Sequence, residues 1–239
     1  MAVPRPWTVT RHDPIEKLEE NLWAVNGDVP GFPPAVRFHR RMQIVKLSDG
    51  RLAFHNAIPL DDAALADVRA WGKPAILIVP HHLHAMDAHA FQAKLGLSAF
   101  TARQVLEKVK VTVDVAGTLE DLPKDPALRC EPLSGTRFGE AAYLVRSGAR
   151  ATLVFCDAIM NSRPGAGFAG FVFNVLGATG PEPRISWMYR LRAVNDTAAL
   201  KRDLMRLAET PGLVRVVPSH GEIVDRDPAG AIRRAVERV

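Results

Sequence analysis

Three short apolar runs, each leading to a histidine or an aspartate, constrain this chain more than any other feature. The run 75–80 leads to His82-Leu83-His84, the run 151–156 leads to Asp157, and the run 213–218 leads to His220. Short apolar runs that end at Pro or at a turn are typical of buried strands. In layered α/β proteins, ligands gather in the loops just beyond the carboxyl ends of strands. The three runs therefore predict one metal site to which distant parts of the chain converge.

The remaining pattern predicts an alternation of hairpins and strand–helix units. Tight turns are expected at Ser48-Asp49-Gly50-Arg51 and, between the strands of a hairpin, at Ser147-Gly148. Asp61 is expected to cap a helix that ends near Trp71. Further helices are predicted over 87–95, 102–109, 197–209 and 229–239. Strands are predicted over 22–26, 42–47, 52–56, 75–79, 99–101, 111–114, 140–145, 151–155 and 214–217, with a loop over 27–41. This order favours two packed sheets with helices outside, a four-layered αββα sandwich that forms a single domain over residues 1–239.

Composition narrows the classes of function. The net charge of +5 comes from scattered Lys and Arg that do not alternate with aromatic residues, so we expect no nucleic-acid partner. With two cysteines far apart and no Cys-x-x-Cys spacing, we expect a reducing, cytoplasmic location. Cys156, inside a strand-like run, is expected to be a small buried apolar residue. No stretch predicts a signal peptide or a membrane span, since the apolar segment 165–180 is short and rich in glycine.

The histidine cluster is the strongest chemical signal. Four of the eight histidines, at 81, 82, 84 and 89, lie within nine residues directly after a predicted strand. An extended loop would place His82 and His84 on one side, where both could bind the same ion. Neutral imidazole suits Zn, Fe or Ni, and the oxygen of Asp157 extends the choice to Mn. The alternatives are a surface cluster of histidines, a turn-capping role for Asp157 and a backbone hydrogen bond for His220.

The order and spacing of these residues resemble the metallo-β-lactamase superfamily. Its signature is His-x-His-x-Asp-His after a strand, then a further His, a bridging Asp after a later strand, and a final His in a glycine-containing loop. In this chain His82, His84, Asp157 and Ser219-His220-Gly221 match that order, and the resemblance extends from Asn21 to the C-terminal helix. It implies an αββα fold, one or two metal ions, and hydrolysis by a metal-bound hydroxide.

The chain departs from the signature at three positions. Met86 and Asp87 stand where the family has Asp and His, and Thr136 stands at the position of the middle His. This pattern resembles a divergent branch of the superfamily with incomplete metal ligands. It implies a site for one Zn, Fe or Mn ion, held by four residues together with Asp87 or His89. These four are His82, His84, Asp157 and His220.

An insert over about 161–192 has a composition of its own. Its glycine-rich apolar stretch is followed by Arg184, Trp187, Tyr189 and Arg190. One interpretation is a lid over the metal, in which Arg190 binds an anionic group of the substrate. The other is a packed helical insert or a homodimer interface, because lids and interfaces share this composition.

Two hypotheses for function follow. The first is a metal-dependent hydrolase whose metal-bound hydroxide attacks a small-molecule ester, lactone or phosphoester, with Asp87 as a ligand or as the group that orients the water. The second is a non-catalytic binding or scaffold protein that keeps the fold with a degenerate metal site. Met86 and Thr136 favour the second hypothesis, whereas the retained histidines and Asp157 favour the first.

Overall fold

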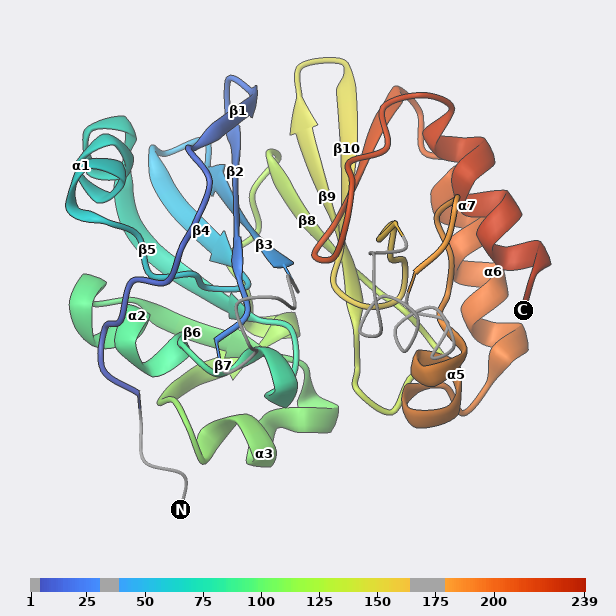
Figure 1. Cartoon of the computed structure of the whole chain (residues 1–239), viewed down its shortest axis with the longest axis horizontal. Helices are drawn as coiled ribbons and strands as arrows, with labels where there is room; N and C mark the ends of the chain where they lie inside the picture. Colours follow the sequence, from blue (N-terminus) through green and yellow to red (C-terminus); the bar gives the residue numbers. More distant parts are fainter. Residues whose placement is uncertain (1–4, 31–38, 164–178) are drawn as a thin grey trace. The chain divides into compact units, whose positions relative to one another are not determined.

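The computed structural model describes residues 5–30, 39–163 and 179–239. The chain divides into two compact units, Met1–Arg129 and Cys130–Val239, each with its own helices (Figure 1). Residues 164–178, the middle of the predicted lid, lie outside the described residues, as do residues 31–38 of the predicted loop.

The first unit contains a seven-stranded sheet in which the strands follow one another in chain order. Its strands are β1 (Glu16–Glu19), β2 (Leu22–Asp28), β3 (His39–Lys46), β4 (Arg51–His55), β5 (Lys73–Val79), β6 (Ser98–Thr101) and β7 (Val115–Thr118). The pairs from β1 to β4 are antiparallel, and the pairs from β4 to β7 are parallel. Gly50 forms the predicted turn between β3 and β4, where its φ of 83° suits a residue without a Cβ.

Helices connect the parallel strands of this sheet. They are α1 (Asp62–Trp71), α2 (Ala88–Leu95) and α3 (Leu106–Lys110). The predicted cap of α1 is confirmed, because the Asp61 carboxylate accepts a hydrogen bond from the Ala64 N–H at 2.8 Å. Parallel neighbours need such crossovers, and these bring the carboxyl ends of β4, β5 and β6 to one edge of the sheet. That edge holds the first group of candidate site residues.

Two tryptophans attach the end of α1 to the antiparallel part of the sheet. The rings of Trp23 on β2 and Trp71 on α1 stack with their centroids 3.8 Å apart and their planes nearly parallel. The ammonium groups of Lys17 and Lys46 lie over the Trp23 and Trp71 rings, at 4.9 and 5.8 Å from the centroids. Such stacks and cation–π contacts add to the free energy of burying the rings.

The second unit is built on a four-stranded sheet in the order β11-β10-β9-β8. Its strands are β8 (Leu128–Pro132), β9 (Ala141–Ser147), β10 (Arg150–Phe155) and β11 (Leu213–Pro218), and its helices are α5 (Trp187–Ala193), α6 (Thr197–Ala208) and α7 (Pro228–Glu237). The β9–β10 hairpin turns at Gly148, as the sequence predicts. By contrast, β10 and β11 are parallel neighbours, so they end at the same edge.

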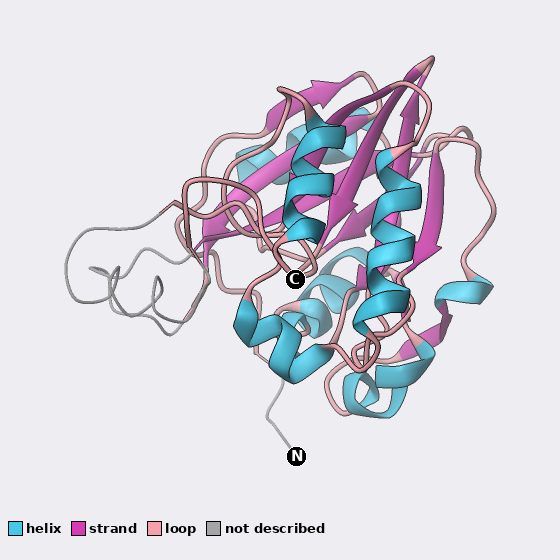
Figure 2. Ribbon diagram, turned by 90° about the vertical axis from the view of Figure 1, so that its right-hand side faces the viewer, coloured by secondary structure: helices cyan, strands magenta, loops and turns pink. Residues whose placement is uncertain are grey.

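Helices α6 and α7 lie side by side in this unit (Figure 2). Leu200 and Leu204 recur at helical spacing on α6, and Ile232 on α7 joins them in one core with Leu153 and Phe155 of β10. All five side chains are at most 1% exposed. The apolar faces of the two helices therefore cover the sheet that carries the second group of candidate residues.

Most elements lie where the pattern predicts them, but some do not. The strand predicted over 111–114 is wrong, because Val111 has helical backbone angles at the end of α3 and the chain becomes extended only at Val115. The β-branched residues there indicate a strand locally, but α3 ends at Lys110 and the chain turns directly after it. The short strands β1 and β8 and the helix α5 have no counterpart in the prediction. No helix among the described residues is long and apolar enough to cross a membrane.

We expect Asp196→Ala to lower the free energy of unfolding by about 1 kcal/mol. The Asp196 carboxylate accepts a hydrogen bond from the Ala199 N–H at 2.9 Å and so satisfies the first turn of α6. Urea denaturation followed by circular dichroism measures the change. Arg202→Ala, at an exposed position of the same helix, is the control and should change stability by less than about 0.5 kcal/mol. Equal effects of the two variants would contradict the capping role.

Candidate metal site

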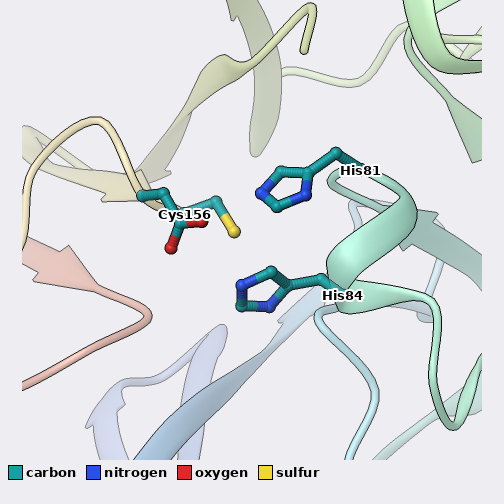
Figure 3. A group of neighbouring side chains, drawn as sticks. His81, His84 and Cys156 are labelled. Atoms are coloured by element: carbon teal, nitrogen blue, oxygen red, sulfur yellow. The ribbon is translucent and has the colours of Figure 1, made fainter. Parts of the chain in front are cut away.

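The first group of candidate residues lies in the turn after β5. His81 is extended, and residues His82–His84 form one turn of 3-10 helix, in which the His84 N–H donates to the His81 carbonyl at 2.9 Å. Residues three apart eclipse each other in such a turn. As a result the rings of His81 and His84 are neighbours, with centroids 4.8 Å apart (Figure 3). The extended loop expected over 82–84 is wrong, and the turn pairs His84 with His81.

The histidines of this turn differ in their exposure to solvent. His81 is 0% exposed and His84 is 7% exposed, whereas His82 is partly exposed and Leu83 is exposed. The pKa of His82 is lowered by partial burial, and the neighbouring His81 and Lys108 lower it further. The two buried rings therefore belong to residues three apart, and they follow a buried strand.

Buried hydrogen bonds connect His84 to the residue after β4 and, through that residue, to β3. The Nδ1 atom of His84 lies 2.8 Å from the amide oxygen of Asn56, the residue after β4. The Asn56 amide nitrogen donates to the Arg41 carbonyl at 2.9 Å. Next to them, His55 Nδ1 lies 2.6 Å from Gln43 Oε1. Burial lowers the pKa of His55 to about 3, with a further contribution from its histidine neighbours, so this ring is neutral.

Asp87 takes part in a buried ion pair. Its carboxylate pairs with the guanidinium of Arg40, and the two side chains are 2% and 0% exposed. Burial lowers the pKa of Arg40, and the adjacent Asp87 carboxylate opposes that shift. In the family signature this position holds a metal-binding imidazole, whereas here it holds the counter-ion of an arginine.

The second group of candidate residues lies beyond the parallel pair β10 and β11. Phe155 and Pro218 are in register at the ends of these strands, so the residues that follow, Asp157 and His220, leave the sheet next to each other. The Asp157 carboxylate lies 3.3 Å from His220 Nε2. Between Phe155 and Asp157, the Cys156 thiol is fully buried. Burial raises its pKa well above the usual value, and the negative charges of Asp157 and Glu140 raise it further.

A buried glutamate fixes the turn that carries Asp157. The Glu140 side chain is at a position only 1% exposed, and its Oε1 accepts the backbone N–H groups of Asp157 and Ala158 at 2.8 and 2.7 Å. Thr136 supports Glu140 in turn, because its hydroxyl donates to the Leu133 carbonyl at 3.1 Å and accepts from the Glu140 N–H at 3.2 Å. The residue that stands at the family's middle-histidine position therefore stabilises a turn.

The residues predicted for the site fall in different surroundings. Asp157 and His220 lie together in the second unit, and His84 and Asp87 are buried in the first. His89 lies on α2, partly exposed and beside a surface hollow that Arg5, Trp7 and Lys94 also line. Arg190 lies on α5 and is partly exposed.

Two buried residues at these strand exits, His81 and Cys156, have metal-binding side chains but were not predicted as ligands from the sequence. His81 belongs to the recognised histidine cluster. An extended loop would place His82 beside His84, whereas the 3-10 turn places His81 there. Cys156 is buried as expected, yet it is also next to Asp157, which was the available signal for a donor role. Among the described residues, His81 and His84 offer two metal-binding side chains in the first unit, and Cys156 and Asp157 offer two in the second.

Comparison with solved structures decides the fold. DIM-1 metallo-β-lactamase exposed to ceftazidime matches with a TM-score of 0.63 and 14% identity, over 97% of this chain and 99% of that chain. A metallo-β-lactamase from Pontibacter korlensis matches with 0.63 and 12%, over 96% and 100%. TMB-1 matches with 0.61 and 14%, over 94% and 96%.

This chain has the metallo-β-lactamase fold. The predicted mixed α/β sandwich is thereby confirmed. No family model matches the sequence, and no curated protein matches it either. At 12–14% identity the likeness to solved structures establishes the fold, and the function has to be argued from the site.

We expect Asp87→Leu to lower the free energy of unfolding by about 3–5 kcal/mol, because it leaves the Arg40 charge buried without its partner. The double variant Arg40→Met/Asp87→Leu removes both charges and should recover much of that loss. Chemical denaturation of the wild type, both single variants and the double variant gives the coupling free energy. Additive effects of the two single changes would mean that the pair contributes no interaction energy.

Proposed function

We propose that this protein is a metal-dependent hydrolase that binds one ion through His81, His84, Cys156 and Asp157. The proposal is supported by two pairs of donors at strand exits, His81 with His84 and Cys156 with Asp157, in a chain with the metallo-β-lactamase fold. Each donor follows a strand whose parallel neighbour ends at the same edge of its sheet. Ligands in α/β proteins gather at such edges.

The chemistry of the donors fits zinc better than manganese. Two imidazole nitrogens, one sulfur and one carboxylate oxygen form a four-donor set of the kind that Zn²⁺ binds, and the soft thiolate disfavours manganese. Because burial raises its pKa, Cys156 is a thiol without metal, and it releases a proton when an ion binds. Metal affinity should therefore rise with pH.

Of the four donors, Asp157 is the one suited to release the metal ion and so leave one coordination position open for water. Its carboxylate is shared with His220 Nε2, whereas the two buried histidines belong to a tight turn. An ion in this site would lower the pKa of water and polarise a carbonyl or phosphoryl oxygen. Paired with His220, the Asp157 carboxylate can accept a proton from an attacking water during hydrolysis.

The substrate class that we propose is a small-molecule ester, lactone or phosphoester. These compounds have the polarisable oxygen that metal-assisted hydrolysis requires. We retain Arg190 as the residue to bind an anionic group of the substrate. His82, Asp87 and His89 stay outside the proposed donor set, since His82 and His89 are partly exposed and Asp87 is paired with Arg40.

The alternative is a non-catalytic binding or scaffold protein that keeps the fold with a degenerate metal site. The buried Arg40–Asp87 pair and the turn-stabilising role of Thr136 favour it, because both positions serve stability where the family signature has histidine ligands. A protein that binds no metal would favour this alternative, and for a metal-loaded protein the measurement of activity decides between the two hypotheses.

Elemental analysis of the purified, untagged protein tests the metal site. We expect about one equivalent of zinc in the wild type and a loss of most of it in His84→Ala and in Cys156→Ala, since each removes one of four donors. His89→Ala, a partly exposed histidine of the same segment, is the control and should keep the wild-type content. Wild-type metal content in both donor variants would show that the proposed site is wrong.

Hydrolysis of chromogenic esters, lactones and phosphoesters tests the reaction. We expect activity that a chelator removes and added zinc restores. Asp157→Asn should lower kcat by about 100-fold or more while the fold is kept, since general-base catalysis contributes about 10²–10⁴-fold. A zinc-loaded protein inactive on all three substrate classes would favour the binding-protein alternative.

A further inference from the structure

Asn56 and His84 meet because the strands that precede them are parallel neighbours. His55, the last residue of β4, is in register with Ile78 of β5, and the Asn56 N–H donates to the Ile78 carbonyl at 3.3 Å. Asn56 is 0% exposed, and its amide oxygen lies 2.8 Å from His84 Nδ1. The side chain thus contacts the ring of a proposed metal ligand.

The orientation of the Asn56 amide follows from its second contact. Its nitrogen lies 2.9 Å from the Arg41 carbonyl, which can only accept a hydrogen bond. The NH₂ group must therefore face Arg41, and the amide oxygen must face His84. Since an amide oxygen also only accepts, Nδ1 of His84 carries the proton. In the neutral ring the lone pair then belongs to Nε2.

We propose that Asn56 is a positioning residue that fixes the Nδ1–H tautomer and the ring orientation of His84, so that Nε2 is the metal-binding atom. The inference rests on the proposed metal site for its consequence, but the tautomer is a property of the metal-free protein. Hydrogen bonds to the second nitrogen of a histidine ligand fix its ring and raise its affinity for metal.

The backbone at this position allows a clean test. Asn56 has a φ of 62°, in the left-handed region that few residues other than glycine adopt. Asn56→Gly therefore keeps the backbone conformation and removes only the amide side chain. Asn56→Asp keeps an oxygen acceptor and also tolerates this conformation.

Imidazole ¹⁵N NMR of the metal-free protein reads the tautomer directly. The spectra are recorded near pH 8, above the ordinary histidine pKa of about 6.5, and His84→Gln assigns the His84 signals. We expect Nδ1–H in the wild type and in Asn56→Asp, and a mixture of tautomers in Asn56→Gly. An unchanged tautomer in a folded Asn56→Gly protein, or Nε2–H in Asn56→Asp, overturns the proposal. If Asn56→Gly does not fold, the Asn56→Asp spectrum decides alone.

Zinc affinity, measured by competition with a chelator, tests the consequence. We expect Asn56→Gly to bind zinc about 10–100-fold more weakly than the wild type, the usual effect of losing such a hydrogen bond. Gln43→Leu is the matched control, because it disturbs the neighbouring pair with His55 and leaves the Asn56–His84 contact in place. It should change affinity by less than about 3-fold, well below the loss expected for a positioning contact. Equal losses in both variants overturn the proposal, whereas a wild type that binds no zinc refutes the proposed function and leaves the NMR result to decide on Asn56.

Discussion

Parallel strand pairing is the constraint on which the candidate site depends. Parallel neighbours end at the same edge of a sheet, so residues far apart in sequence become adjacent without any direct attraction between them. β4 and β5 bring Asn56 to His84 in this way, and β10 and β11 bring Asp157 to His220. The hydrogen bonds at these exits refine positions that the sheets have already set.

Buried charged and polar side chains then determine the role of the residues that follow each strand. Glu140 accepts two backbone N–H groups in the Asp157 turn, and Arg40 neutralises Asp87 inside the first unit. A carboxylate that is held by a buried arginine serves stability at a position where the related signature binds metal. One fold can thus carry different side chains at the same position, because the backbone geometry and the identity of these side chains are set by different residues.

Much of the architecture could be predicted from the sequence. The cap at Asp61 and the turns at Gly50 and Gly148 are local signals that led to the right elements, and most of the apolar runs did so too. The site was harder, because its geometry depends on how a turn winds. Within His81–His84, an extended chain and a 3-10 turn select different pairs of rings, and the sequence contains no local signal that separates them.

By itself the sequence determined most of the strands and helices and the edges at which chemistry could gather, because these follow from hydrophobic periodicity and turn residues. Only the tertiary structure decided which side chains share an environment. It brought the rings of His81 and His84 together, placed the Asn56 amide in hydrogen-bond contact with His84, and paired Asp87 with Arg40. These choices depend on strand register and burial, which arise when distant segments pack and which no single stretch of sequence encodes.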